Sequence, residues 1–278
     1  MLRSFFKRGQ PRADARSGRN AEPGAASVPT GAVVWAVGDI HGRLDLLEPL
    51  LDAILDDLRA SDATRKVIVF LGDYIDRGAD SRGVLDRLCS LQDQTEIETH
   101  FLRGNHEDRM EAFLDDPEVG PGWCEYGGRE ALRSYGVTSP TMKVASDAWV
   151  VTAAEFGQAV PDRHREFLSR QEYSCSIGAY FFAHAGARPG VALAEQSPDD
   201  LMWIRQGFLN DRTPFEQIVV HGHTPGETVH ADHRRIAIDT GAYATGMLTG
   251  LRLEAAARET LNTRLAGPTV RLERRPLA

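Results

Sequence analysis

The sequence VIVFLGDYIDRG, residues 67–78, joins a short apolar run directly to a tight polar turn. The run 67–71 is rich in β-branched and aromatic side chains, which is typical of a buried β-strand. Gly72 then lets the backbone turn sharply, and Asp73, Asp76 and Arg77 follow it. This pattern predicts a strand that delivers charged side chains to one edge of a sheet.

Further runs of the same kind lie on both sides of this stretch. The predicted strands are Val33–Val37, Val67–Leu71, Thr99–Leu102, Ala179–Ala183, Gln217–Val220 and Arg235–Ile238. Leu44–Leu58 repeats apolar residues with the period of a helix, and Ser81–Leu91 predicts a second helix. Strands that alternate with helices indicate a layered α/β domain with a partly parallel sheet.

Each predicted strand is followed within a few residues by Asp, Asn or His in a tight turn. The turns are GDIHG (38–42), GDYIDRG (72–78), RGNHE (103–107), HAG (184–186), HGHTP (221–225) and DTG (239–241). In open α/β sheets ligands bind at the carboxyl ends of strands, so we expect these side chains to converge. Mixed oxygen and imidazole ligands suit Mn, Fe or Zn. Their number suits two ions bridged by a carboxylate.

Each of these motifs also has a purely structural explanation. A single Asp after a Gly is commonly a turn or a helix cap, and a single buried His is commonly a hydrogen-bonded core residue. Six such motifs in succession would require six independent coincidences. The series as a whole therefore favours a metal centre.

The motifs GDIHG, GDYIDRG, RGNHE, HAG, GHTP and DTGA, in this order, resemble those of the calcineurin-like metallophosphoesterases. The resemblance is greatest to the phosphoprotein phosphatase branch, especially its bacterial and phage members, and it covers about residues 33–253. It implies a β-sandwich flanked by helices, with a dinuclear metal site at the carboxyl ends of strands.

The same resemblance implies a set of metal ligands. One metal would be held by Asp39, His41 and Asp73, and the second by Asp73, Asn105, His184 and His223. We expect two divalent ions, Mn²⁺ in the first place, with Fe or Zn as alternatives. A hydroxide that bridges the ions would attack phosphorus in line, since metals lower the pKa of bound water.

Four further residues receive roles from the resemblance. His106 would be the general acid that protonates the leaving group, and Asp76 would orient it and keep it protonated. Arg77 and Arg205 would bind the phosphate together with Asn105, because arginine forms paired hydrogen bonds to phosphate oxygens. For Arg205 the structural alternative is an arginine on a surface helix.

Residues around the ligands are assigned more loosely. We expect His221 and Asp239 to support the ligands from behind, Asp239 by a hydrogen bond to a ligand histidine. Tyr243 could line the pocket, although a packed tyrosine is the expected state. Gly127-Gly128 and a helix at 129–135 would belong to a cap over the site.

Other catalytic classes fit the sequence poorly. A cysteine-dependent phosphatase needs Cys-x5-Arg, but Cys124 is followed by Arg129 at a shorter spacing. A zinc protease needs His-Glu-x-x-His, and Met110 stands where the second histidine would be. A nuclease of the same superfamily usually carries Gly-His-x-His, but here Pro225 occupies the last position. A catalytically inactive binding protein with the same fold would have lost metal ligands, and none of the expected metal ligands is missing from the sequence.

The expected activity is that of a metal-dependent phosphomonoesterase acting on phosphoserine or phosphothreonine in a protein or peptide. The alternative is hydrolysis of dinucleoside polyphosphates or other nucleotides. That branch typically has Gln in place of His41 and lacks the Asp76-Arg77-Gly78 turn. Because the chain lacks a long C-terminal extension and docking modules, no fixed regulatory subunit is expected.

Composition limits the class of protein further. Of the 278 residues 42% are hydrophobic and 26% are charged, which is ordinary for a globular chain. The net charge of −8 argues against a general nucleic-acid binder, which needs a basic surface to neutralise phosphates. No uninterrupted apolar run of about 18 residues occurs, so we expect no membrane span.

The N-terminal residues differ from the rest. Residues 1–28 are basic, rich in Gly, Ala, Ser and Pro, and predict a disordered tail. Residues 29–278 would form one domain, with a helical or irregular excursion above the sheet at about 110–175. The tail lacks the apolar segment of a secretory signal, and three cysteines at irregular spacing do not suggest a disulfide framework. We therefore expect a cytoplasmic protein.

Overall fold

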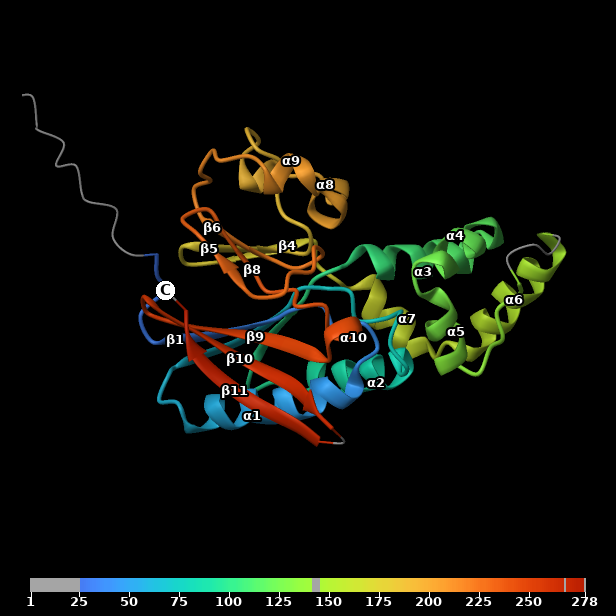
Figure 1. Ribbon diagram of the computed structural model, residues 1–278, viewed down its shortest axis with the longest axis horizontal. Coiled ribbons are helices and arrows are strands. Elements are labelled where there is room, and N and C mark those ends of the chain that lie inside the picture. Colours follow the sequence, from blue (N-terminus) through green and yellow to red (C-terminus); the bar gives the residue numbers. More distant parts are fainter. Residues whose placement is uncertain (1–25, 142–145, 268, 278) are drawn as a thin grey trace, which may run out of the picture.

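Two mixed β-sheets pack face to face, and helices cover their outer faces (Figure 1). The structure is a computed structural model that describes residues 26–141, 146–267 and 269–277. The expected α/β class and the β-sandwich are both confirmed. The strand pattern alone had predicted one partly parallel sheet, whereas the six predicted strands are divided equally between the two sheets.

The first sheet has six strands in the order β11-β10-β9-β1-β2-β3. Their bounds are β1 (Ala32–Val37), β2 (Arg65–Phe70), β3 (Glu98–Phe101), β9 (Met247–Glu254), β10 (Ala257–Ala266) and β11 (Thr269–Pro276). Strands β1, β2 and β3 are parallel, with Val37 opposite Phe70 and Phe70 opposite Phe101. Because these three strands end in register, the turns that follow them leave the sheet at the same edge.

The second sheet has five strands in the order β4-β5-β6-β8-β7. Their bounds are β4 (Ser174–Ile177), β5 (Tyr180–Ala183), β6 (Ile218–His221), β7 (His230–Ala231) and β8 (Arg235–Ala237). Strands β5, β6 and β8 are parallel, and Val220 lies opposite both Phe182 and Ile236. Their carboxyl ends therefore also reach a common edge.

Helices flank the sheets and extend beyond them. The helices are α1 (Leu44–Ala60), α2 (Ser81–Gln92), α3 (Asn105–Asp115), α4 (Gly120–Glu125), α5 (Gly128–Ser134), α6 (Ser146–Ala159), α7 (Asp162–Ser169), α8 (Pro198–Trp203), α9 (Gln206–Leu209) and α10 (Ala242–Thr245), with the 3-10 turns η1 (Pro117–Val119) and η2 (Leu193–Glu195). Helices α1 and α2 lie against the first sheet and α8 and α9 against the second (Figure 1). Helices α3–α7, here called the helical lobe, project past one end of the sheets.

The core follows from the alternation of side chains along the strands. In β1, Val34 and Ala36 face the second sheet and pack with Phe182, while Val33 and Trp35 face the helices. Successive residues of a strand point to opposite faces, so one fully buried strand serves both layers. The run of buried residues in β1 therefore fixes it as a central strand.

Most predicted elements are found within one or two residues of their expected bounds. Helices α1 and α2 match the predicted helices, and residues 110–175 hold most of the helical lobe. Strands β9–β11 were not predicted. Of the predicted tail, residues 1–25 lie outside the described residues, whereas Val28 is buried and its N–H donates to the carbonyl oxygen of Ala255. Within the described ranges, no helix combines the length and the apolar character that crossing a bilayer requires.

Candidate metal centre

The turns behind the parallel strands of both sheets meet at one place. Asp39 and His41 follow β1, Asp73 follows β2, Asn105 begins α3 after β3, His184 follows β5 and His223 follows β6. All six side chains belong to buried residues. Glycine allows the close approach of these turns: a Cβ on Gly72, whose φ is +100°, would lie 2.7 Å from the backbone nitrogen of Gly104.

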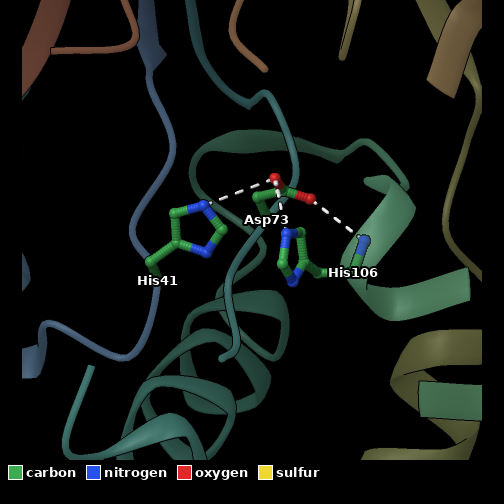
Figure 2. Close-up of side chains that lie close together, drawn as sticks. All are labelled: His41, Asp73 and His106. Atoms are coloured by element: carbon green, nitrogen blue, oxygen red, sulfur yellow. Dashed lines mark hydrogen bonds and ion pairs between the residues drawn. The ribbon is translucent and has the colours of Figure 1, made fainter. Parts of the chain in front are cut away.

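Asp73 lies between two groups of histidines. Its Oδ2 is 3.5 Å from Nε2 of His41 and 3.9 Å from Nε2 of His106. Its Oδ1 is 3.3 Å from Nε2 of His184. Figure 2 shows His41 and His106 beside the Asp73 carboxylate, and the backbone N–H of His106 also donates to Oδ1 at 3.2 Å. One carboxylate thus presents different oxygens to different imidazoles.

Two groups of side chains have the spacing of a metal site. His41, Asp73 and His106 form one, and Asp73, His184 and His223 form the other; within each, the ligand atoms lie within 4.8 Å of one another. Asn105 adds its Oδ1 to the second group, 3.0 Å from Nε2 of His184. Nitrogen and carboxylate ligands in this mixture fit a transition metal such as Mn, Fe or Zn.

The histidines are held in the form that binds a metal. Nδ1 of His41 lies 2.8 Å from the carbonyl oxygen of Ile75, and Nδ1 of His184 lies 2.9 Å from that of Leu71. Each Nδ1–H donates to its carbonyl, which leaves Nε2 free as a ligand atom. Burial lowers the pKa of His41 to about 3 and that of His223 to about 2, so both rings are neutral.

Burial also acts on Asp73, but its neighbours outweigh it. Desolvation alone would raise the pKa of the Asp73 carboxyl. His184, His106 and His41 lower it instead, far below its usual range. The carboxylate is therefore ionised in the neutral pH range, as a bridging ligand must be.

Asp39 stands outside the two groups but has an unsatisfied oxygen. Its Oδ2 accepts a hydrogen bond from the backbone N–H of His223 at 2.9 Å. Its Oδ1 is buried and has no hydrogen-bond partner among the described residues. Burial raises the pKa of Asp39 well above its usual range, and the charges of Asp239 and Asp73 add to this. A cation beside Oδ1 would satisfy an atom that otherwise has a large desolvation penalty.

The predicted acid and its orienting carboxylate are in direct contact. Nδ1 of His106 lies 2.6 Å from Oδ2 of Asp76, and the indole N–H of Trp123 donates to the same oxygen at 2.7 Å. Burial alone would lower the pKa of His106, but Asp73 and Asp76 raise it above its usual value. No sequence motif pointed to Trp123, which comes from the helical lobe.

The two predicted phosphate-binding arginines contact different histidines of the centre. Nη2 of Arg77 is 3.1 Å from Nε2 of His106. The Nε–H of Arg205 donates to Nε2 of His223 at 2.9 Å. Both line a cavity of about 640 Å³ whose wall continues over the helical lobe through Trp123 and Tyr126. Paired N–H groups facing one cavity beside the ligands suit an oxyanion.

Backbone strain is concentrated in these turns. Among the described residues other than glycine, positive φ angles of 48° to 70° occur at His41, Asp73, Asp76, Arg77 and His223, besides Ala255. Each such residue costs about 1–3 kcal/mol and persists only where its surroundings hold it in place. The turns therefore depend on supporting contacts.

Glu107 supplies one such support, and no role for it was predicted from the sequence. Its buried carboxylate accepts N–H bonds from Tyr74 at 2.8 Å, Asp73 at 2.9 Å, Gly104 at 3.0 Å and Ile75 at 3.3 Å. It thus joins the turn after β2 to the start of α3. Burial and the charge of Asp73 raise the pKa of Glu107, and the N–H groups of Tyr74 and Asp73 oppose that shift by stabilising the carboxylate.

Asp239 and His221, the two residues expected to support the ligands from behind, both lie beside ligand residues. Asp239 accepts the N–H of Gly241 at 2.8 Å rather than bonding to a ligand histidine, because the tight turn folds the carboxylate onto its own backbone. His221 packs on the ring of Phe208 and accepts from Arg235 at 3.2 Å, and its Nδ1 lies 3.0 Å from the carbonyl oxygen of Gly222, the residue before His223.

Tyr243 is not a packed residue. Its side chain is 38% exposed and lies at the centre, edge-on to His41 at 5.3 Å between ring centroids and under the guanidinium of Arg77 at 4.6 Å. Helix α10 carries it there because the preceding turn brings the chain back to the strand ends. Its ring therefore lies between a ligand candidate and a predicted phosphate-binding arginine.

Known proteins resemble this chain in sequence and in fold. The family model for calcineurin-like phosphoesterases matches residues 32–247. The asymmetrical bis(5'-nucleosyl)-tetraphosphatase PrpE of Geobacillus thermodenitrificans is 26% identical, over 78% of this chain and 88% of its own length. Serine/threonine-protein phosphatase 1 of Salmonella typhimurium is 29% identical, over 80% and 92%.

A solved structure shares the fold. The cold-active protein-tyrosine phosphatase of a psychrophilic Shewanella species superimposes with a TM-score of 0.54 at 17% identity, over 91% of this chain and 83% of the other. At this identity the likeness concerns the fold alone.

Proposed function

This chain belongs to the calcineurin-like phosphoesterase family, and on that premise we propose that it is a protein serine/threonine phosphatase dependent on two divalent metal ions. The proposal rests on the position of Asp73: its two carboxylate oxygens face two different groups of histidines, and the hydrogen-bonded His106–Asp76 pair lies next to it. Mn²⁺ is the ion we favour, with Fe or Zn as alternatives.

The residues fit a pair of ions. The first set of ligands would be Asp39, His41 and Asp73, and the second Asp73, Asn105, His184 and His223. Two cations held there would supply Lewis acidity and lower the pKa of a water nucleophile towards neutrality. Asp39 is supported as a ligand by its unsatisfied Oδ1, and Asp73 as the bridge by its position between the groups.

Arg77 and Arg205 would orient the phosphate over the centre. Arg77 already lies 3.1 Å from Nε2 of His106, and Arg205 donates to Nε2 of His223. The oxygens of a phosphate ester are better partners for a guanidinium than an imidazole ring. Binding of the ester would therefore draw Arg77 away from Nε2 of His106 and expose that nitrogen to the leaving group.

His106 would donate the proton to the leaving oxygen. Its Nδ1 is fixed by Asp76, so Nε2 is the nitrogen that can reach the substrate. Asp76 and Asp73 favour the protonated ring, which is the form a general acid requires. Serine and threonine alkoxides are poor leaving groups that need this proton, whereas a departing phosphate anion of a nucleotide needs it much less. A buried acid pair therefore supports an alkyl phosphomonoester as substrate.

The same site supports a second candidate, hydrolysis of dinucleoside polyphosphates. The Geobacillus relative is named for that activity. The cavity contains a third arginine, Arg109, whose guanidinium lies 4.8 Å from the ring centroid of Trp203, and the 67% exposed ring of Tyr126. A further phosphate and a flat base are groups that such side chains would bind.

One assay separates the two candidates. The full chain is freed of metal, resupplied with Mn²⁺, and offered a phosphothreonine peptide and diadenosine tetraphosphate side by side, with Asp73→Asn as the blank. We expect a higher kcat/KM for the peptide. A preference for the dinucleotide would change the proposed substrate but not the proposed metal centre. If neither compound is hydrolysed, the proposed activity is contradicted.

A further inference from the structure

We propose that Trp123 is a positioning residue that holds Asp76, and through it His106, from the helical lobe. The inference rests on the proposed function, because it concerns the acid that would protonate the leaving group. The part of the lobe that fixes this acid is the segment at residues 123–128, here called the docking turn, which runs from the end of α4 to the first residue of α5.

The contact to Asp76 is direct and shielded from water. Nε1 of Trp123 donates to Oδ2 of Asp76 at 2.7 Å, and that oxygen is also the one 2.6 Å from Nδ1 of His106. Trp123 is 2% exposed and Asp76 is fully buried. An indole N–H can only donate. The oxygen is therefore fixed between two donors, and its rotation would break both bonds at once.

The carboxylate has little else to hold its side chain. Its Oδ1 is buried and lacks a hydrogen-bond partner in the part of the chain that the structure describes. The backbone N–H of Asp76 donates to Oγ of Ser81, which fixes the main chain and not the carboxylate. Without the indole, the carboxylate could rotate and His106 would lose a fixed partner.

The indole itself is rigidly packed. Its ring lies 5.2 Å from the ring of Phe113 and 5.6 Å from that of Phe156. On another side it covers Gly128, where a Cβ would lie only 2.4 Å from Cδ2 of the indole. The lobe core therefore determines where the N–H points.

The docking turn also holds the residue next to Asp76. The N–H of Arg77 donates to the carbonyl oxygen of Gly127 at 3.1 Å, and its Nε–H donates to that of Tyr126 at 3.2 Å. Gly127 has a φ of +114°, and a Cβ there would lie 2.5 Å from Cγ of Arg77. Asp76 and Arg77 both have positive φ. The helical lobe thus supports the strained residues Asp76 and Arg77 through both a side chain, that of Trp123, and backbone carbonyl groups.

A matched pair of variants tests this role. Trp123→Phe removes the N–H and keeps an aromatic ring. Trp149→Phe is the control: Trp149 is also buried in the lobe and packs on Phe113, but its Nε1 has no hydrogen-bond partner within the described residues. Both variants lose the same atoms from the same core, and only one loses the contact to Asp76.

The kinetic measurement compares kcat and KM for phenyl phosphate and 4-nitrophenyl phosphate with the full chain loaded with Mn²⁺. The nitrophenolate departs readily without a proton, and the phenolate does so less readily. For Trp123→Phe we expect kcat on phenyl phosphate to fall about tenfold or more, with a change of less than about threefold on 4-nitrophenyl phosphate and in KM. Equal losses on both esters, or the same selectivity in Trp149→Phe, would overturn the proposal.

A spectroscopic measurement tests the contact independently of turnover. In proton–nitrogen correlation spectra, the assigned indole N–H of Trp123 should lie downfield and move upfield in Asp76→Asn. The indole of Trp35, which donates to Asp57 at 3.1 Å, is the internal reference and should not move. If the wild-type protein hydrolyses neither ester, the proposed function fails, but this spectrum still tests the contact between Trp123 and Asp76. An indole signal of Trp123 that does not shift in Asp76→Asn would reject the contact.

Discussion

Nε2 of His184 lies 3.2 Å from Nδ1 of His223. Neither ring can turn away, because Nδ1 of His184 is bonded to the carbonyl oxygen of Leu71 and Nε2 of His223 accepts from Arg205. Burial lowers the pKa of both histidines, so one proton lies between two neutral rings. To bind a divalent cation through Nδ1, His223 would have to carry its proton on Nε2 and release Arg205, since metals bind the unprotonated nitrogen.

Asp73→Asn tests the shared ligand. Loss of one negative charge between the two histidine groups should remove both ions and lower turnover by at least about 100-fold, because the phosphate would lose its electrophilic partners. Metal content by mass spectrometry and kcat on 4-nitrophenyl phosphate check this. Asp52→Asn, at an exposed position of α1, is the control. A variant that keeps both ions and most of its turnover would exclude the bridging role.

His106→Asn separates proton donation from metal binding. We expect metal content to stay at the wild-type level, and kcat on a phosphothreonine peptide to fall about 100-fold, within the usual range for loss of a general acid. The loss on 4-nitrophenyl phosphate should be much smaller, because its leaving group needs no proton. Parallel losses on the two substrates would contradict the assignment of His106 as the acid.

Glu107→Gln tests the support beneath the centre. An amide in place of the carboxylate would turn an NH₂ group towards backbone N–H donors, so the free energy of unfolding should fall by about 1–3 kcal/mol. Urea unfolding of the metal-free protein measures this. Glu111→Gln, one turn further along α3 and paired with Arg103, should cost less. Equal costs at the two positions would show that the four donors do not depend on a carboxylate.

Buried His221 predicts a stability that depends on pH. Burial lowers the pKa of His221 to about 3, whereas an unfolded chain titrates near 6.5. Between these values the unfolded state binds the extra proton, so the free energy of unfolding falls as the pH drops below about 6.5, by about 1 kcal/mol per pH unit for this residue. His221→Gln should flatten the slope between pH 6.5 and 4.5 by that amount, as measured by urea unfolding at several pH values. An unchanged slope would show that residues other than His221 cause the loss of stability at low pH.

The sequence allowed the site-bearing half of the fold to be predicted because its strands are buried on both faces. In β1 and β2 the apolar runs are continuous, and each ends in a turn with a distinctive residue pattern. Strands β9–β11 were missed because polar and charged residues interrupt their apolar positions. β11, at the edge of its sheet, is mostly exposed and carries three arginines, Arg271, Arg274 and Arg275.

The ligand candidates could be named because each stands inside a motif. Glu107 lies in such a motif as well, but its four N–H partners come from two separate turns, which only the assembled structure brings together. Trp123 lies 47 residues from Asp76, in a stretch without a diagnostic motif. Tyr243 was expected to be packed because tyrosine usually is, and its exposure follows from the return of the chain at α10.

Because the parallel strands are divided between two sheets, the metal centre would also connect the two sheets. Asp73 and Asn105 come from the first sheet, whereas His184 and His223 come from the second. An ion that binds all four would cross-link the halves of the sandwich, and its binding free energy would resist their separation. Neither sheet alone supplies a complete set of ligands. A fragment of the chain, or a protein whose two sheets have moved apart, would therefore lose activity while its strands are still formed.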